Sequence, residues 1–195
     1  MNCYVLAGGR SRRMGRSKRE LFLDRVAAAA RGAFDEVIVV DRAFEGEHEG
    51  EGPVFGIRAA LQHARQGRCF VLAVDYPLIT TEVLCYLRDH PVGGQAPSPV
   101  LHRRGACAPT GTTMLVPIWH DKPQPLCAVY DTSLLPLVER RIADHQFDLR
   151  GLIAEAHAEI IDESDLRTRF AGEPLLNVNT PHDLEEFHER VLASR

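Results

Sequence analysis

The sequence predicts an α/β fold: a three-layer, doubly wound and mainly parallel sheet with helices on both faces. Three observations predict it. Short apolar runs alternate with longer segments of helical pattern along the chain. One run, Phe70–Val74, is continuously apolar, as in a parallel strand covered on both faces. Turns rich in glycine or carboxylates follow several runs directly, where open parallel sheets bind their ligands.

Six strands and six helices are expected in this order. The strands are Cys3–Ala7, Glu36–Val40, Cys69–Val74, Thr112–Pro117, Ala158–Ile161 and Pro174–Asn177. The helices are Lys18–Ala33, Phe55–Gln66, Thr80–His90, Ser133–His145, Leu149–Ala156 and His182–Ala193. Short strands separated by helices of this length indicate βαβ units. Residues 41–53 and 91–111 are rich in glycine and are expected to be loops.

Length and composition indicate one globular domain spanning residues 1–195. The chain is 45% apolar and 26% charged, with a net charge of −4. Its basic character is confined to residues 10–19, which favours a small anionic ligand over nucleic acid or an anionic membrane. Neither a membrane-spanning apolar run nor a signal peptide is recognisable, so we expect a cytoplasmic protein.

The cysteines and histidines give no sign of a metal centre. Five cysteines are widely spaced without a C-x-x-C pair, so neither a disulfide framework nor a zinc site is expected. Cys3 and Cys69 fall in expected strands, where a buried thiol is usual. The nine histidines form no ligand cluster and are interpreted as surface or packing residues.

The first expected strand runs into a basic turn that contains Gly8, Gly9 and Gly15. Five cations stand within nine residues: Arg10, Arg12, Arg13, Arg16 and Lys18. Glycines allow backbone N–H groups to approach a ligand, and the following helix would direct its N-terminus to the same place. The spacing is neither that of a P-loop nor that of a dinucleotide fingerprint. The turn therefore predicts a triphosphate site; a basic surface turn is the alternative.

Asp75 directly follows the continuously apolar strand, and Tyr76 and Pro77 then turn the chain away. A carboxylate facing bound phosphates is a natural ligand for Mg²⁺, which prefers one or two carboxylates with phosphate oxygens and waters. The alternative is an aspartate that only caps a helix or stabilises a turn.

Three segments carry a resemblance to a known family. The first reads Leu6-Ala7-Gly8-Gly9-x-Ser11-x-Arg13-Met14-Gly15-x-x-Lys18, the second Asp75-Tyr76-Pro77-Leu78, and the third Asn177-Val178-Asn179-Thr180-Pro181. Together they resemble the molybdenum cofactor guanylyltransferase family, whose shorter elements are also matched by Gly52–Gly56 and Gln124–Leu126. The matches run in family order from residue 4 to residue 188.

The resemblance implies a Rossmann-like fold of the nucleotide-diphospho-sugar-transferase type and a Mg²⁺-dependent transfer of GMP from GTP to the terminal phosphate of molybdopterin. It implies Arg13, Lys18 and Asp75 as catalytic residues, with Arg13 and Lys18 on the β- and γ-phosphates and Asp75 on the metal. The nucleotide-binding residues would be Leu6, Ala7, Gly8, Gly9, Gly15, Lys18, Asp41, Glu45 and Asp75. Asn177 and Asn179 would bind the acceptor, and their alternation with Val178 would direct both amides to one side.

Several acidic residues are candidates for recognition of the nucleotide base. Guanine presents two adjacent donors to which a carboxylate is a good partner. The family reads the base near Asp41 and an acidic residue of the next loop, where Glu45 is the nearest match. Glu47 and Glu49 are further candidates, and the whole run also fits a solvated acidic loop.

Several alternatives stay open. A CTP-using relative, or one with another phosphorylated acceptor, would keep the same phosphate and metal sites. A nucleotide-binding protein without turnover is the third alternative, because the segment after Lys18 is shorter than the family pattern. Transient contacts with other enzymes of molybdenum cofactor synthesis are also expected.

Overall fold

The computed structural model describes residues 1–8, 18–41, 44, 52–65, 67–90 and 112–193. The strands are β1 (Asn2–Leu6), β2 (Glu36–Val40), β3 (Arg68–Ala73), β4 (Met114–Trp119), β5 (Lys122–Pro123), β6 (Cys127–Asp131) and β7 (Ala158–Ile161). The helices are α1 (Lys18–Ala33), α3 (Pro53–Ala64), α4 (Thr81–Asp89), the 3₁₀ helix η2 (Thr132–Leu134), α5 (Leu135–Ala143), α6 (Leu149–Glu155), α7 (Glu163–Arg169) and α8 (Pro181–Ala193).

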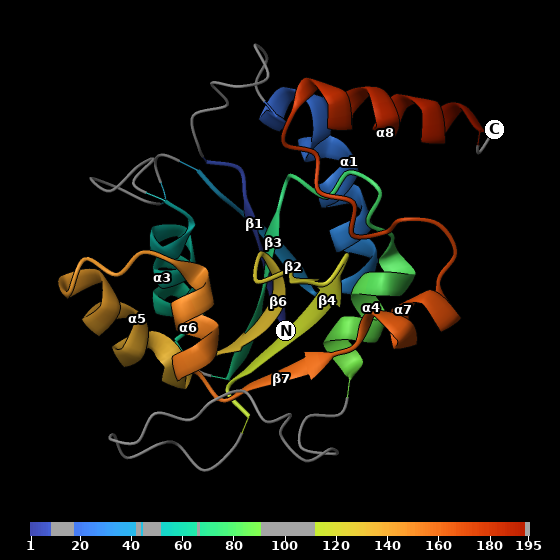
Figure 1. The fold of residues 1–195 in the computed structure, drawn as a ribbon. Coiled ribbons are helices and arrows are strands. Elements are labelled where there is room, and N and C mark those ends of the chain that lie inside the picture. The colour runs from blue at the N-terminus through green and yellow to red at the C-terminus, as the bar shows by residue number, and fades with distance from the viewer. Residues whose placement is uncertain (9–17, 42–43, 45–51, 66, 91–111, 194–195) are drawn as a thin grey trace.

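All seven strands belong to one sheet of order β2-β1-β3-β6-β4-β5, with β7 also paired to β4 (Figure 1). β1 is parallel to both β2 and β3. β6 is antiparallel to both β3 and β4, and β7 is parallel to β4. Consequently β1, β2, β3, β4 and β7 share one direction, which confirms the mainly parallel sheet.

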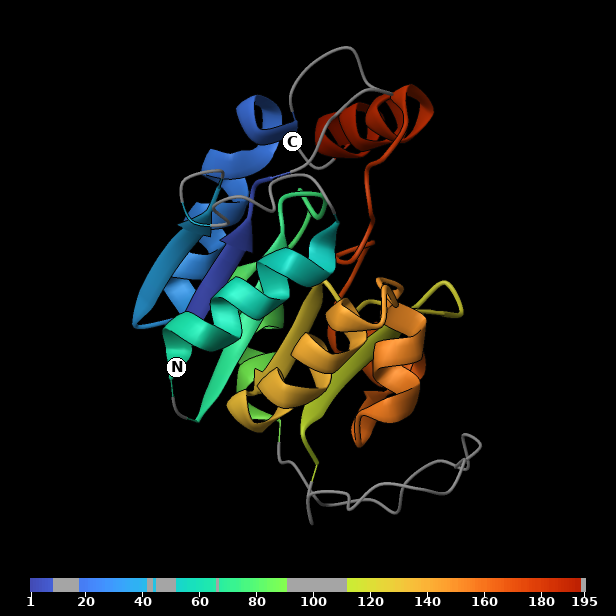
Figure 2. The ribbon, with the colours of Figure 1, turned by 90° about the vertical axis from the view of Figure 1, so that its left-hand side faces the viewer.

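Helices cover both faces of the sheet, as the sequence predicts. Figure 2 looks onto α3, α5 and α6, while α1, α4, α7 and α8 lie on the opposite side. β1 contributes side chains to the core on both faces of the sheet. Cys3 and Val5 lie in the core under α1 and α4, whereas Tyr4 and Leu6 lie in the core under α3. This alternation of fully or nearly fully buried side chains is that of a central strand.

Four elements differ from the sequence prediction. β5, β6 and α7 were not expected from the sequence. β6 contains only a short apolar run, and Leu166 is the one buried residue described in α7, so the sequence signal of both elements is weak. The expected strand Pro174–Asn177 is instead a turn, closed by a bond from Leu176 N to Glu173 O. Pro174 has no N–H to donate to a ladder, which disfavours a central strand there.

The helix bounds agree closely with the prediction because local signals set them. α1 matches the expected range Lys18–Ala33. The Thr80 hydroxyl accepts a bond from Val83 N and caps α4. α3 begins two residues before the expected Phe55, with Pro53 in its first turn.

The described cysteines are Cys3, Cys69, Cys85 and Cys127, and all four are free thiols. Burial raises the pKa of the Cys69 thiol to about 12, as expected for a packing residue. Among the described residues, no helix is both long and apolar enough to cross a membrane.

Candidate active site

Three parallel strands, β1, β2 and β3, have their carboxyl ends side by side, and we call this end of the sheet the rim. In the ladder Leu6 of β1 lies opposite Val40 of β2 and Ala73 of β3. One step beyond, Ala7 N donates to Val40 O at 3.0 Å and Val74 N to Leu6 O at 3.3 Å. Gly8, Asp41 and Asp75 therefore leave neighbouring strands at the same edge, as predicted.

Several predicted residues lie outside the described part of the chain. These are Gly9, Arg13, Gly15 and Glu45, together with the alternatives Glu47 and Glu49 and the neighbouring cations Arg10, Arg12 and Arg16. Lys18 is described through its backbone, as the first residue of α1. Their roles remain predictions from the sequence.

The acceptor segment meets Asp75 directly. Val178 N donates to the main-chain oxygen of Asp75 at 2.8 Å, and the Val178 side chain is fully buried. The side chain of Asn179 donates from Nδ2 to Oδ1 of Asn177. Both amides therefore lie on one side of the buried Val178, as expected, although the segment is not a strand.

The start of α8 anchors the same segment. Asp183 Oδ2 accepts the backbone N–H groups of Asn179 and Thr180, each at 2.8 Å, and Asp183 N donates to the Thr180 hydroxyl at 3.2 Å. Thr180 and Asp183 thus cap each other's backbone N–H groups, as the two residues of a capping box do. Desolvation raises the pKa of Asp183, but the hydrogen bonds with Asn179 and Thr180, together with His182, outweigh it and the net pKa is lowered.

Two residues at the rim were not given a role from the sequence. The Tyr76 hydroxyl donates to Gln124 Oε1 at 3.0 Å, which ties the turn after β3 to the segment before β6. Gln124–Leu126 was recognised only as a family-like segment. The bond depends on how β6 pairs with β3, and β6 was not predicted.

Asp41 has a cationic neighbour that the sequence did not single out. Both terminal nitrogens of Arg19 lie 3.4 Å from Asp41 Oδ2, and both side chains are partly exposed. The pair links the first turn of α1 to the end of β2. A base-reading carboxylate would thus act beside an arginine.

Asp75 fits a magnesium ligand by its chemistry and position. It is a half-buried hard oxygen donor at the rim, beside the strand that leads into the glycine-rich turn. Among the described residues no group of three or more histidines, cysteines or carboxylates could hold a metal. A carboxylate in this place suits Mg²⁺, which prefers one or two carboxylates together with substrate phosphates and waters.

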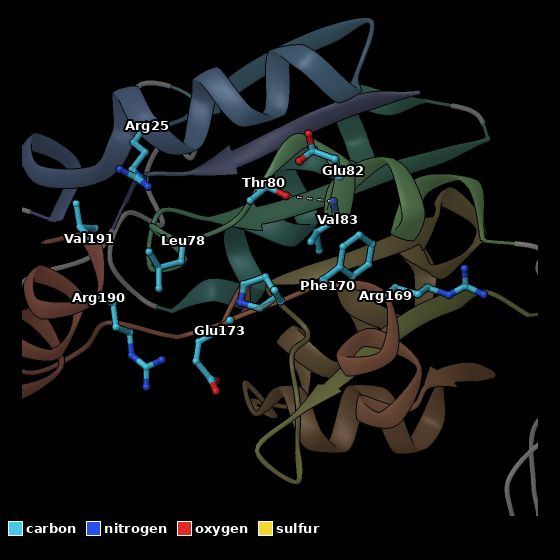
Figure 3. Close-up of a pocket in the computed structure, with 13 residues that line it drawn as sticks. Arg25, Leu78, Thr80, Glu82, Val83, Arg169, Phe170, Glu173, Arg190 and Val191 are labelled. Atoms are coloured by element: carbon cyan, nitrogen blue, oxygen red, sulfur yellow. Dashed lines mark hydrogen bonds between the residues drawn. The ribbon is translucent and has the colours of Figure 1, made fainter. Parts of the chain in front are cut away.

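An open cavity of about 740 Å³ lies between α1, α4, α8 and the segment after α7 (Figure 3). None of the predicted site residues lines it. Arg25, on the cavity wall, donates from Nε to Pro77 O at 2.6 Å and so braces the turn that carries Asp75. Further lining residues include Leu78, Val83, Phe170, Arg190 and Val191.

The sheet order and the rim define the class: an α/β protein with the fold of the nucleotide-diphospho-sugar transferases. The structure of molybdopterin-guanine dinucleotide biosynthesis protein A from Archaeoglobus fulgidus matches all of both chains with a TM-score of 0.74, at 24% identity.

The particular family follows from the sequence comparisons. A family model described as the MobA-like NTP transferase domain matches residues 3–160, and the chain belongs to this family. A relative from Pelotomaculum thermopropionicum, named "Probable molybdenum cofactor guanylyltransferase", is 30% identical over 97% of this chain and 91% of its own length. One of the same name from Aquifex aeolicus is 29% identical over 98% and 90%.

Proposed function

We propose that this protein transfers GMP from GTP to the terminal phosphate of molybdopterin and so forms molybdopterin guanine dinucleotide. One observation carries the proposal. Asp75, at the end of the strand beside Gly8, is bonded through its main chain to Val178, between Asn177 and Asn179. The residues predicted for the nucleotide and for the acceptor are thus joined at Asp75. The names of the relatives are consistent with this reaction.

The reaction is a displacement at the α-phosphorus of GTP. An oxygen of the molybdopterin phosphate attacks that phosphorus, and the bond to the oxygen bridging the α- and β-phosphates breaks. Pyrophosphate then leaves with both electrons of that bond. A phosphate monoester has a second pKa of about 6, so the nucleophile is already largely ionised at neutral pH and needs no general base. What the protein must provide is neutralisation of charge and alignment of two anions.

The chain's own residues divide this task. Arg13 and Lys18 would neutralise the β- and γ-phosphates, and the backbone at Gly8, Gly9 and Gly15 would approach them closely. Asn177 and Asn179 would orient the acceptor through amide hydrogen bonds. Asp75 would hold Mg²⁺, which would supply positive charge beside the α-phosphate.

Guanine selection is proposed for the end of β2. Asp41, and Glu45 in the following loop, would accept hydrogen bonds from N1–H and the 2-amino group of guanine. Arg19, paired with Asp41 at 3.4 Å, would orient that carboxylate. A cytosine-reading pocket is the principal alternative. The cytoplasmic location, the single domain and the transient contacts with related enzymes stay predictions.

Thermal stabilisation by nucleotides tests base selection. The protein is melted with Mg²⁺ and GTP, CTP or ATP, and GTP is expected to raise Tm most, because a ligand that binds only the folded state stabilises it. Repeating the melt with EDTA tests the role of the metal and should reduce the shift. A larger shift with CTP would overturn the guanine assignment.

Turnover is tested separately, by measuring pyrophosphate release from GTP with molybdopterin present. We expect release that depends on molybdopterin and on Mg²⁺. A protein that is stabilised by GTP but releases no pyrophosphate would be a nucleotide-binding protein without turnover. Undiminished release in EDTA would instead remove the metal from the proposal.

A further inference from the structure

The segment proposed to bind the acceptor is held at both of its ends. At the C-terminal end, Asp183 accepts two of its backbone N–H groups, as described above. At the N-terminal end, Leu176 N donates to the main-chain oxygen of Glu173 at 3.0 Å and closes a turn directly before Asn177. The position of this turn therefore bears on the position of the acceptor amides.

The Glu173 carboxylate ties the turn to the end of β4. Its Oε2 accepts from Trp119 Nε1 at 2.9 Å and lies 2.9 Å from His120 Nε2. Trp119 is only 1% exposed, and a buried indole N–H needs an acceptor. Burial of Leu175 and Leu176 holds the turn as well. Apolar contacts are non-directional, however, so the hydrogen bonds of the carboxylate are what fix the orientation of the turn.

The partner of Glu173 is itself held firmly. His120 and Asp121 form the two-residue turn between β4 and β5, with φ values of 50° and 57°. Such left-handed conformations are required in this kind of hairpin turn, and in residues other than glycine they persist where the surroundings hold them. Here Glu163 Oε2 accepts from Asp121 N at 3.2 Å, and Glu173 contacts His120. Two carboxylates thus hold the two residues of the turn.

Arg167 connects these two carboxylates. Its Nη2 lies 2.6 Å from Glu163 Oε1 and its Nη1 lies 3.4 Å from Glu173 Oε1. The guanidinium carbon is 4.3 Å from the centroid of the Trp119 ring, at stacking distance. The side chains of Glu163 and Glu173 are similarly exposed, at 19% and 14%. Only Glu173, however, belongs to the turn that precedes the acceptor segment.

We propose that Glu173 is a positioning residue for the acceptor. Its carboxylate, fixed by Trp119 and His120, holds the turn that places the amides of Asn177 and Asn179. This role rests on the proposed function. It extends the support of the acceptor site to the end of β4, which no motif of the sequence indicated.

The test is Glu173→Ala, which removes the carboxylate and leaves the backbone bond to Leu176 possible. Pyrophosphate release is measured against molybdopterin concentration at saturating GTP. Loss of the hydrogen bonds that orient the turn is expected to raise KM for molybdopterin about 3-fold to 10-fold. The kcat and the KM for GTP should change less than about 2-fold, because the acceptor segment contributes uniform binding.

Glu163→Ala is the matched control. It also removes a carboxylate from Arg167 and one bond from the β4–β5 turn. Tm should fall about as much as in Glu173→Ala, whereas KM for molybdopterin should stay unchanged. An equal rise in KM for the two variants would show a general loss of stability and overturn the positioning role.

Trp119→Phe tests the same link from the other side. It keeps an aromatic ring beside Arg167 and removes the N–H, so it reports on the link even if Glu173→Ala melts below the assay temperature. KM for molybdopterin should rise in the otherwise unmodified protein and should not rise further in the Glu173→Ala background.

The outcomes separate the two proposals. Fully additive effects of Trp119→Phe and Glu173→Ala, or an unchanged KM for molybdopterin in either single variant, would refute the positioning role and leave the proposed function intact. Absence of pyrophosphate release by the unmodified protein would instead refute the proposed function, and the positioning role with it.

Discussion

The two halves of the sheet place their site residues by different means. In the N-terminal half, formed by β1, β2 and β3, parallel backbone pairing alone brings Gly8, Asp41 and Asp75 to one edge. In the C-terminal half, formed by β4, β6 and β7, the residues that reach the rim are held by side-chain hydrogen bonds. Gln124, which accepts from the Tyr76 hydroxyl, and Asn177, which accepts from Asn179, are examples.

This difference has a consequence for substitutions. A side chain that stands on a strand end can be replaced by an isostere while the backbone stays in place. A side chain that belongs to a hydrogen-bond network cannot, because its partners lose their bonds too. Substitutions in the N-terminal half should therefore affect the chemistry more than the stability, and many in the C-terminal half should do the reverse.

The largest effect is expected from Asp75→Asn. The substitution removes the charge of the proposed metal ligand but keeps the main-chain oxygen that accepts from Val178. We expect kcat for pyrophosphate release to fall about 100-fold to 1,000-fold, the usual loss when one transition-state contact to developing charge is removed. Tm should stay nearly unchanged.

Asp131→Asn is the control for this charge. Asp131 lies opposite Arg68, at the far end of β3 from Asp75. The Asp131→Asn substitution should leave kcat for pyrophosphate release unaltered. If Asp75→Asn kept full activity, or lost it only in proportion to a fall in Tm, the N-terminal half would not carry the metal site.

The same contrast explains how much could be predicted from the sequence. The parallel half, α1 and the capped start of α8 follow from local patterns: apolar runs, a Thr-Pro cap and glycine-rich turns. The position of β6 does not, since pairing an antiparallel strand between β3 and β4 depends on contacts between distant residues. The Tyr76–Gln124 bond depends on that pairing. Pro174–Asn177 was wrongly expected to be a strand because its apolar residues are buried by a turn.

Arg141→Met tests the C-terminal half. Arg141 is only 3% exposed; it donates to the Asp148 carboxylate and main-chain oxygen and to Glu155, and so joins α5 to α6. Asp148 and Glu155 are 66% and 39% exposed, so water can replace their lost bonds. We expect a loss of about 2–3 kcal/mol in the free energy of unfolding, from broken hydrogen bonds and lost packing. That is a fall in Tm of about 5–10 °C for a chain of this size.

Arg140→Met is the matched control, because Arg140 also pairs with Glu155 but is 52% exposed. Its effect on the free energy of unfolding should stay below about 1 kcal/mol. KM for both substrates should be unchanged in both variants. A change in KM for molybdopterin in Arg141→Met would show that the helices of this half also shape the site.

Asp183→Asn should have a smaller effect, at the point where α8 supports the acceptor segment. The carboxylate accepts two backbone bonds at the start of α8, and weakening such a cap costs about 1 kcal/mol. The folded-state pKa of Asp183 is lowered, so this stabilisation is present above the ordinary value of 3.8 and is lost as the pH falls through the folded-state value.

Thermal melts of both proteins at two pH values check this sign. The variant should melt below the unmodified protein at neutral pH, and the difference should disappear below the folded-state pKa of Asp183. A difference that persisted there would mean that the carboxylate charge does not supply the stabilisation. KM for molybdopterin should rise only slightly, because the bonds from Val178 N to Asp75 O and from Asn179 to Asn177 remain.

The smallest effect on stability is expected from Arg19→Gln, in the N-terminal half. The pair with Asp41 spans 3.4 Å and is partly exposed, and such pairs contribute about 0–1 kcal/mol. Tm should therefore hardly change. If Asp41 reads the base, the loss of its cationic neighbour should raise KM for GTP about 2-fold to 3-fold, since a rim charge acts mainly through screening and orientation. Asp41→Asn, which changes the reading group itself, should raise KM for GTP more than Arg19→Gln does. The reverse order would transfer recognition of the nucleotide from the end of β2 to the first turn of α1.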